Sequence, residues 1–177
     1  MAELNIIIAG FGGQGVLFTG KVMAYAGLID EKEISWLPSY GPEMRGGTAN
    51  CSVCISDRPI GSPLVTQPNI LVAMNTPSFD KFIGTVAPGG KIITDSSLVK
   101  ATTDRTDIEI FGIPATQLST DEDLHGLSNI IILGKVLKET AFASFETIEQ
   151  AIIKCIPERK QHLLEPNMRA IKLGMES

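Results

Sequence analysis

Three glycines near the start of the chain have the spacing of a phosphate-binding turn. Gly10, Gly12 and Gly15 fit the pattern G-x-G-x-x-G. A tight turn suits Gly10, a close approach of backbone to a ligand suits Gly12, and close packing of a helix on a strand suits Gly15. A helix that starts after such a turn offers free N–H groups and a partial positive charge. The pattern therefore predicts a phosphate-binding turn or, as the alternative, a tight turn that binds no ligand.

The segments on either side of the glycines predict a strand and a helix. The β-branched run at 4–10 is typical of a buried strand. Residues 16–30 have helical length and an apolar period, so a first helix is expected there. The glycine motif then lies at a strand-to-helix junction, which is where such a motif binds phosphate.

The sequence lacks one residue that the binding of a dinucleotide cofactor requires. A Rossmann fingerprint needs an acidic residue at the end of the second strand, which binds the ribose. The second strand is expected at 34–37 and is followed by Pro38, with no acid after it. A P-loop is also excluded, because the near-match at 15–22 has Val22 where a magnesium-binding Ser or Thr is needed. NAD and FAD are therefore disfavoured.

A second loop of unusual composition, at 39–47, carries the best single polar candidate. Its three glycines and one proline hold the backbone tightly, and Arg45 projects from it. A guanidinium beside a helix N-terminus can bind a phosphate or the carboxylate of a partner. The alternatives are an ion pair with Glu43 or a contact between subunits.

Strands and helices alternate along the chain. Further strands are expected at 48–56, 70–74, 91–94 and 108–113, and further helices at 79–86, 128–140 and 145–156, followed by a helical tail with a break at Pro166. Thr76 or Ser78 is expected to cap the helix at 79–86. Ser144 is expected to cap the helix at 145–156. This order predicts one domain over residues 1–177, a three-layer α/β/α Rossmann-like fold with a largely parallel sheet. The carboxyl ends of its strands should bring 10–15, 39–47 and 75–78 together.

Composition excludes several classes of function. The net charge is −5 and no basic patch is present, so nucleic acid is not an expected ligand. No apolar run approaches the length of a membrane span and no secretory signal is recognised, which predicts a cytoplasmic protein without membrane contact. Cys51 and Cys54 form a C-x-x-C on an expected strand, where residues three apart point to opposite faces, so they and Cys155 are expected to be buried structural cysteines.

Four other polar features are expected to play no catalytic part. His125 and His162 have no partner that would form a triad, and the acidic run at 121–123 is expected to be a solvated turn. Asn129 starts an apolar helix, where a cap or an interface contact is expected. No metal site is predicted.

Two segments of the sequence together resemble a known family. Gly-Phe-Gly-Gly-Gln-Gly-Val at 10–16 and Pro-Ser-Tyr-Gly-Pro-Glu-Met-Arg-Gly-Gly-Thr at 38–48 resemble the gamma subunit of 2-oxoacid:ferredoxin oxidoreductases, and the segments at 50–53 and 72–78 continue the match. The loop at 38–48 is most similar to that of 2-oxoglutarate synthases. Branched-chain 2-oxoacid enzymes are close behind, and pyruvate enzymes are less similar.

The resemblance implies a role in a multi-subunit enzyme. These enzymes decarboxylate a 2-oxoacid oxidatively on thiamine diphosphate, pass electrons through iron–sulfur clusters to ferredoxin and release an acyl-CoA, and they can run in reverse. The resemblance places thiamine diphosphate between alpha and beta subunits, the clusters on beta, delta or equivalent partners, and coenzyme A with the gamma domain. The candidate ligand or interface residues that it implies are Gly10, Gly12, Gly13, Gln14, Gly15, Arg45, Gly46 and Gly47.

The residues agree that this chain cannot catalyse the reaction alone. It has no thiamine-binding signature, three cysteines where a cluster takes about four ligands, and no acid–base set. Three interpretations stay open: a subunit that binds coenzyme A, a purely structural subunit of the same complex, and a free-standing nucleotide- or flavin-binding enzyme. The missing ribose-binding acid counts against the third.

Overall fold

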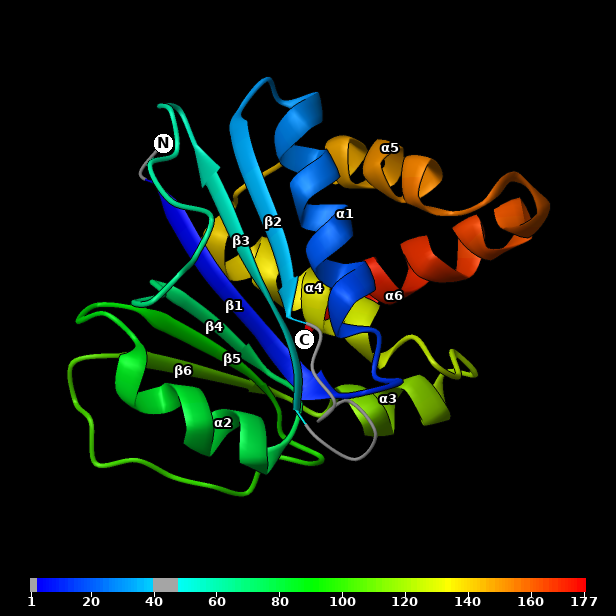
Figure 1. Cartoon of the computed structure of the whole chain (residues 1–177). Coiled ribbons are helices and arrows are strands. Elements are labelled where there is room, and N and C mark those ends of the chain that lie inside the picture. Colours follow the sequence, from blue (N-terminus) through cyan, green and yellow to red (C-terminus); the bar gives the residue numbers. More distant parts are fainter. Residues whose placement is uncertain (1–2, 40–47) are drawn as a thin grey trace.

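Six strands form a mixed sheet in the computed structural model, which describes residues 3–39 and 48–177 (Figure 1). The order across the sheet is β2-β3-β1-β4-β5-β6. The strands span Leu4–Phe11 (β1), Glu33–Ser39 (β2), Thr48–Ser56 (β3), Ile70–Ala73 (β4), Lys91–Asp95 (β5) and Glu109–Ile113 (β6).

The sheet is largely parallel, as the sequence predicts, and β3 is the exception. Strands β1, β4, β5 and β6 pair in parallel, whereas β3 pairs antiparallel with both β1 and β2. Because β3 lies between them, β2 runs in the same direction as β1. The carboxyl ends of β1, β2 and β4 therefore meet at one edge of the sheet.

Helices cover both faces of the sheet unequally. Five helices lie on one face, and α2 packs on the other (Figure 1). The helices span Val16–Ile29 (α1), Thr76–Phe82 (α2), Ala115–Asp121 (α3), Ser128–Thr140 (α4), Phe145–Cys155 (α5) and Leu164–Glu176 (α6). Short 3-10 turns follow α2 at Ile83–Thr85 and precede α6 at Glu158–Leu163. None of these helices has both the length and the apolar content needed to cross a membrane.

Alternation along the strands produces two hydrophobic cores. Ile6 and Ile8 of β1 face the layer of five helices, and Ile7 faces α2. The two cysteines of the C-x-x-C follow the same rule, since Cys51 belongs to the first core and Cys54 to the second. The prediction that they point to opposite faces and are buried is confirmed. Burial raises the pKa of the Cys51 thiol to about 12, so this thiol stays protonated at neutral pH.

One of the two predicted helix caps is wrong. Asn75 is the N-cap of α2, where its Oδ1 accepts a hydrogen bond from the backbone N–H of Ser78 at 2.9 Å. Thr76 is already helical, and its hydroxyl donates to the carbonyl oxygen of Leu98 at 3.1 Å. The prediction of Ser144 is confirmed, since its hydroxyl accepts from the N–H of Thr147 at 3.0 Å.

Two prolines do not interrupt the elements that contain them. Pro38 lies inside β2, which is an edge strand and tolerates a missing N–H. Pro166 lies in the first turn of α6, where the N–H has no helical partner, so the predicted break at Pro166 is wrong. The chain bends earlier, at Lys160. No helix was predicted at 115–121, because the seven residues of α3 are too few for a clear period.

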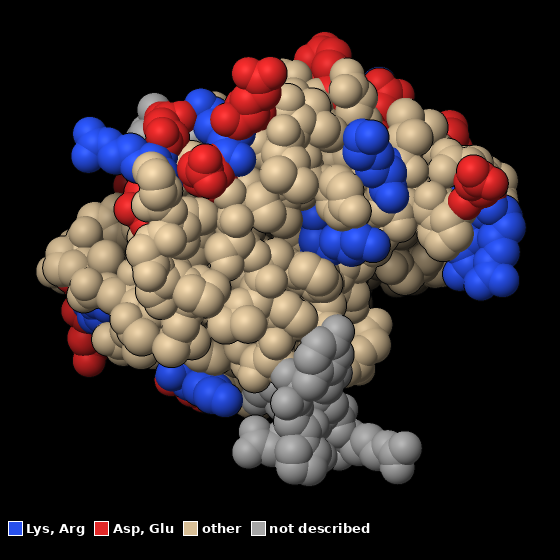
Figure 2. All heavy atoms as spheres, turned by 45° about the horizontal axis from the view of Figure 1, so that its top comes forward, with Lys and Arg blue, Asp and Glu red and all other residues tan. Residues whose placement is uncertain are grey.

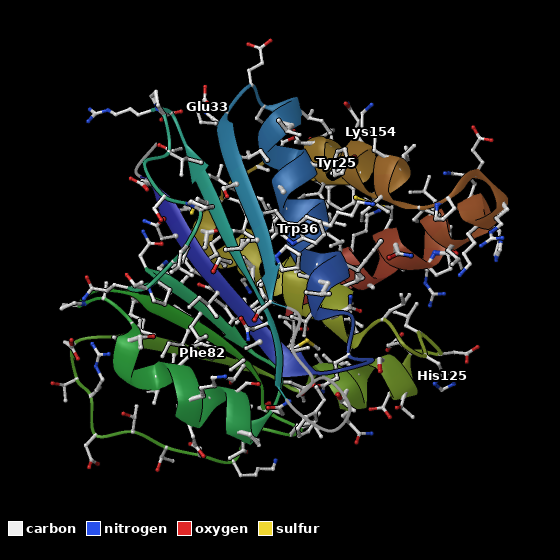
Figure 3. All side chains as sticks on the ribbon, in the orientation of Figure 1. Tyr25, Glu33, Trp36, Phe82, His125 and Lys154 are labelled. Atoms are coloured by element: carbon white, nitrogen blue, oxygen red, sulfur yellow. The ribbon has the colours of Figure 1, made fainter. Side chains whose placement is uncertain are left out.

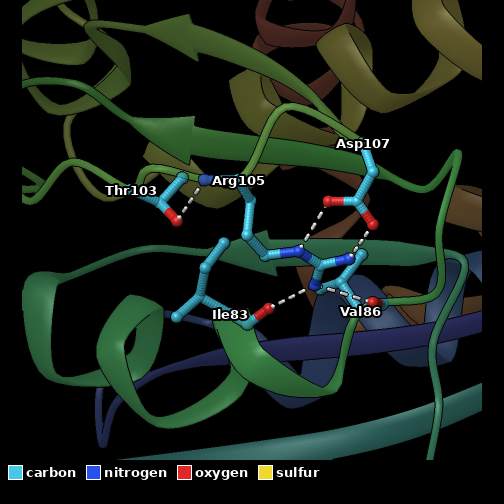
Figure 4. Close-up of polar contacts among 5 residues, drawn as sticks. All are labelled: Ile83, Val86, Thr103, Arg105 and Asp107. Carbon is cyan, nitrogen blue, oxygen red and sulfur yellow. Dashed lines mark hydrogen bonds and ion pairs between the residues drawn. The ribbon is translucent and has the colours of Figure 1, made fainter.

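An arginine clasp fixes the long connection between β5 and β6 (Figure 4). The guanidinium of Arg105 donates from Nε and Nη2 to the carboxylate of Asp107 at 2.9 and 2.6 Å. Its Nη1 donates to the carbonyl oxygens of Ile83 and Val86 at 3.0 and 2.8 Å. The clasp thus ties this connection to the end of α2. The hydrogen bond from Arg105 lowers the pKa of the Asp107 carboxyl.

This lowered pKa predicts an acid-sensitive contribution to stability. A carboxyl whose pKa is lower in the folded state stabilises the fold above its unfolded pKa of about 4, and the contribution is lost as the pH falls below that value. We expect Asp107→Asn to lower the urea midpoint at pH 7 and to shrink the difference between pH 7 and pH 3. Asp104→Asn is the matched control, since Asp104 is exposed nearby and has no hydrogen bond or ion pair to a described residue. An equal pH response in wild type and Asp107→Asn would contradict the assignment.

Helices α4 and α6 cross at a pair of glycines. A Cβ added at Gly134 would lie 2.2 Å from the carbonyl oxygen of Ile171, and one added at Gly174 would lie 1.9 Å from that of Ile131. Both obstacles are backbone atoms, which cannot move without shifting a helix. The separation of the two helices therefore requires glycine at both positions.

We expect Gly134→Ala to destabilise the fold, because overpacking of this kind costs about 1–3 kcal/mol. The free energy of unfolding in urea measures the effect. Gly61→Ala is the control, since an added Cβ there meets no atom within 4 Å. Equal stability of the two variants would show that α4 and α6 can separate freely.

Candidate functional site

The side chain of Gln14 joins the two turns that follow β1 and β4. Its Oε1 accepts hydrogen bonds from the backbone N–H of Phe11 at 2.6 Å and from Nδ2 of Asn75 at 3.1 Å. Its Nε2 donates to the carbonyl oxygen of Met74 at 3.3 Å. The prediction that 10–15 and 75–78 lie together is confirmed.

Of the third segment predicted at this edge, 39–47, the structure describes only Ser39. Strand β2 ends at Ser39, on the same edge as the glycine turn. Arg45, Gly46 and Gly47 lie outside the described residues, as does Tyr40. Their part in the site stays a prediction.

The structural roles of the glycines in the turn differ from the predicted ones. Gly13 and Gly15 have positive φ values of 95° and 73°, which favour glycine. Gly10, expected to permit the tight turn, lies within β1, and a Cβ there would stand 2.8 Å from both Gln14 Oε1 and Val16 Cγ2. Gly12 is exposed. The turn therefore bends at Gly13 and Gly15, and Gly10 permits close packing.

Asn129 anchors the turn from α4. Its side chain is buried, and its Nδ2 donates to the carbonyl oxygen of Gly15 and to the hydroxyl of Thr19, each at 3.2 Å. The N-cap of α4 is Leu127, so the expectation of a cap at Asn129 is wrong. A Cβ on Gly15 would lie 2.4 Å from Nδ2 of Asn129, so glycine at this position is also a condition for the anchor. A polar residue in an apolar helix was a signal of such an anchor, but its partner, Gly15, is too distant in the sequence to be identified from it.

The start of α1 offers backbone N–H groups to a ligand. Its first turn has no acidic residue and its N-cap makes no side-chain hydrogen bond. Val16 and Leu17, in the first turn, have no helical acceptor for their N–H groups. They line a hollow of about 280 Å³ together with Gly12, Gly13 and Phe11. The helix dipole and these donors suit an anionic group such as a phosphate.

A buried carboxylate at the same edge is a structural residue that the sequence analysis missed. Asp95 ends β5 and is fully buried. Its oxygens accept hydrogen bonds from the N–H of Ser97 at 3.0 Å and from the N–H and hydroxyl of Thr116 at 3.1 and 2.5 Å. These bonds fix the start of α3 against the sheet. An acid directly after a buried strand was the signal that could have found it.

The remaining titratable candidates are dispersed. His125 lies on the loop before α4 (Figure 3), close to the exposed carboxylate of Asp123 at 3.2 Å, and His162 is also exposed. The run at 121–123 is exposed, which confirms the predicted solvated turn. Within residues 3–39 and 48–177, no three His, Cys, Asp or Glu side chains come close enough to hold a metal ion.

A three-layer α/β domain with a glycine turn at the carboxyl edge of its sheet belongs to the class of Rossmann-like binding domains. Residues 5–177 match the family model for pyruvate ferredoxin/flavodoxin oxidoreductase. The chain belongs to this family.

Similar proteins include subunits of enzymes named for different 2-oxoacids. The chain is 36% identical to 2-oxoglutarate synthase subunit KorC of Methanocaldococcus jannaschii, over 97% of this chain and 92% of KorC. It is 37% identical to ketoisovalerate oxidoreductase subunit VorA of Methanothermobacter thermautotrophicus, over 98% of this chain. The chain spans about a third of VorA, 36% of its length.

A solved structure has the same fold. The gamma subunit of a keto/oxoacid ferredoxin oxidoreductase from Geobacter sulfurreducens superposes with a TM-score of 0.86 at 30% identity, and the match covers 99% of this chain and 96% of that one. The resemblance drawn from the segments at 10–16 and 38–48 is confirmed at the level of the family and the gamma-type subunit.

The bridge made by Gln14 gives a test of how the site is held. Gln14→Leu leaves the buried Nδ2 of Asn75 and the buried carbonyl oxygen of Met74 without their partner, and each unsatisfied buried group costs about 1–3 kcal/mol. We expect a clear loss in the free energy of unfolding, measured in urea. Gln67→Leu is the matched control, because Gln67 is exposed and forms no hydrogen bond with a described residue. Equal losses in both variants would contradict a bridging role for Gln14.

Proposed function

We propose that this chain is the gamma subunit of a multi-subunit 2-oxoacid:ferredoxin oxidoreductase, which converts a 2-oxoacid, coenzyme A and oxidised ferredoxin into acyl-CoA, carbon dioxide and reduced ferredoxin. The observation that carries the proposal is the match along the whole chain to subunits of these enzymes. In this proposal the enzyme acts on 2-oxoglutarate, because the 2-oxoglutarate synthase subunit KorC matches over nearly its full length. A branched-chain 2-oxoacid is the second candidate, supported by the similarity to VorA.

Partner subunits supply the redox chemistry in this proposal. An iron–sulfur cluster takes about four cysteine ligands, and the chain has three cysteines, two of which point to opposite faces of the sheet. Thiamine diphosphate and the clusters then belong to alpha, beta and delta or equivalent subunits, through which electrons reach ferredoxin. Three buried free thiols also support a cytoplasmic location, where thiols stay reduced.

The surface around the site supports docking of a partner subunit. In the view of Figure 2, uncharged residues extend across the middle of the face down to the residues that are not described. Phe11 and Leu37, at the carboxyl ends of β1 and β2, are 41% and 40% exposed. Large exposed apolar side chains at one edge of a sheet are typical of an interface between subunits.

The glycine turn binds a phosphate of coenzyme A in this proposal. Open N–H groups at the start of α1 and the left-handed backbone at Gly13 and Gly15 support it. Arg45 completes the site with a bidentate hydrogen-bond donor, as the family resemblance implies. The chain's own part is to bind and orient coenzyme A.

The complex reconstituted with this chain tests the function. We expect ferredoxin reduction that depends on coenzyme A and is fastest with 2-oxoglutarate, compared with 2-oxoisovalerate and pyruvate. We expect Arg45→Ala to weaken the affinity of the complex for coenzyme A about tenfold, since one charge-assisted hydrogen-bond pair is lost. Arg58→Ala is the matched control on an exposed turn.

Two results would contradict separate parts of the proposal. Unchanged affinity for coenzyme A in the Arg45→Ala complex excludes Arg45 from the site. Failure of this chain to associate with thiamine- and cluster-bearing subunits, together with tight binding of NAD(H) by the chain alone, would favour a free-standing nucleotide-binding enzyme.

A further inference from the structure

The sheet ends at an open edge formed by β6. This strand is the outermost one on the side opposite β2, and among the described strands it pairs with β5 alone (Figure 1). Edge strands that stay unpaired usually carry a proline, a lysine or a bulge, which prevents another strand from adding. β2 has such a residue in Pro38, whereas β6 has neither proline nor lysine and pairs with β5 in an unbroken register. The edge at β6 is therefore the one that can accept another strand.

The register of β6 shows which of its backbone groups face outward. Glu109 donates its N–H to the carbonyl oxygen of Gly90 at 2.9 Å, so the backbone groups of Glu109 face β5. Successive residues of a strand direct their backbone groups to alternate sides, so those of Ile110 and Gly112 point away from β5. Both residues are exposed. The edge therefore presents two N–H donors and two carbonyl acceptors to a further strand.

A large side chain and a glycine lie next to each other on one face of this edge. Ile110 is 45% exposed, and Gly112, two residues along on the same face, has no side chain. The fold does not require this glycine, because an added Cβ would stand 3.4 Å from its nearest neighbour, the Cβ of Ser96, and the residue has no positive φ. A glycine inside a strand often marks the close approach of another backbone.

Two copies of this edge are complementary to each other. If two β6 strands pair antiparallel about a twofold axis at Phe111, Ile110 of each copy lies opposite Gly112 of the other copy. These are hydrogen-bonded pairs, which exchange N–H···O bonds in both directions, so every outward group of the two residues gains a partner. Each isoleucine side chain also covers the glycine opposite to it. A twofold contact of this kind closes on itself and leaves no further edge.

The charges on the other face of β6 agree with the same register. Glu109 is exposed and forms no ion pair with a described residue. The ammonium of Lys91 lies 5.5 Å from the centroid of the Phe111 ring, and no described carboxylate pairs with it. In the antiparallel register Glu109 of one copy is a diagonal neighbour of Phe111 of the other copy, at about 7–8 Å. The carboxylate then faces this ammonium, and the two copies of Glu109 stay apart.

We propose that β6 binds a second copy of this chain, edge to edge and antiparallel about Phe111, so that the two six-stranded sheets become continuous. One short strand from each copy makes a small interface, so the dimer is reversible. The dimer does not require the partner subunits proposed above.

Sedimentation equilibrium of the full chain tests the dimer. We expect the mean mass to rise from that of one chain, 19.0 kDa, towards that of two as the concentration increases. We expect Ile110→Lys to weaken dimerisation at least about tenfold, because it brings a buried charge into each half of the contact. Ile153→Lys is the matched control, since Ile153 is 41% exposed on α5, and it should dimerise like wild type.

A proline at 112 separates pairing from folding. The N–H of Gly112 points away from β5, so Gly112→Pro removes a donor from the dimer and none from the sheet of one copy. We expect this variant to have the circular dichroism spectrum of the wild type and to be a monomer at concentrations where the wild type is a dimer.

A cross-link tests the register. Two residues that face each other at a non-hydrogen-bonded position have Cα atoms about 4.5 Å apart, which a disulfide can span. We expect Phe111→Cys to form a disulfide between two chains on mild oxidation, whereas Leu98→Cys, at a side chain that is 40% exposed, should not. The native cysteines are buried and do not compete.

Four results would overturn the proposal. They are a single-chain mass at every concentration, equal dimerisation of Ile110→Lys and Ile153→Lys, a folded Gly112→Pro variant that still dimerises, and a dimer in which Phe111→Cys does not cross-link. A monomeric wild type whose Ile110→Lys variant fails to join the thiamine- and cluster-bearing subunits would assign the edge to a partner subunit instead. Full ferredoxin reduction by a complex with Ile110→Lys leaves the proposed enzyme intact, so the two proposals fail separately.

Discussion

The amide of Gln14 is the interaction on which the edge of the sheet depends. One side chain satisfies the N–H of Phe11 after β1, the carbonyl oxygen of Met74 after β4 and the amide of Asn75. Asn75 in turn caps α2 with its own oxygen. The glycine turn, the end of β4 and the first turn of α2 are therefore one hydrogen-bonded unit, and the open N–H groups of α1 have a fixed direction because the unit is rigid.

The second constraint comes from the opposite side of the turn. Asn129 reaches from α4 to the carbonyl oxygen of Gly15 and to Thr19. Its close approach requires the left-handed glycine at 15, where any side chain would overlap the amide. The layer of five helices and the carboxyl edge of the sheet thus meet at one glycine, and the close crossing of α4 and α6 at Gly134 and Gly174 fixes α4 from behind.

The sequence predicted the elements with strong periods and missed what depends on distant residues. The strand at 48–56 and the helix at 128–140 were predicted with the bounds that the structure has. The reversed direction of β3, the bridge made by Gln14 and the anchor at Asn129 could not be derived, because each depends on a pairing between segments far apart in the chain. The predicted boundaries at Pro38 and Pro166 were wrong. An edge strand and the first turn of a helix both tolerate a proline, and the sequence alone does not show that these two residues occupy such positions. The glycine spacing identified the turn, but not which glycine performs which task.

The anchor at Asn129 has a consequence for the order of folding. It joins residues that are 114 positions apart, so the glycine turn acquires its final contacts only after α4 has docked on α1. Long-range closures of this kind form slowly, because a large loop must be ordered before the contact is gained. During synthesis the strand and helix around the turn emerge first, and the geometry of the turn is completed late. A nascent chain that ends before α4 would therefore have the glycine motif without the final conformation of the turn.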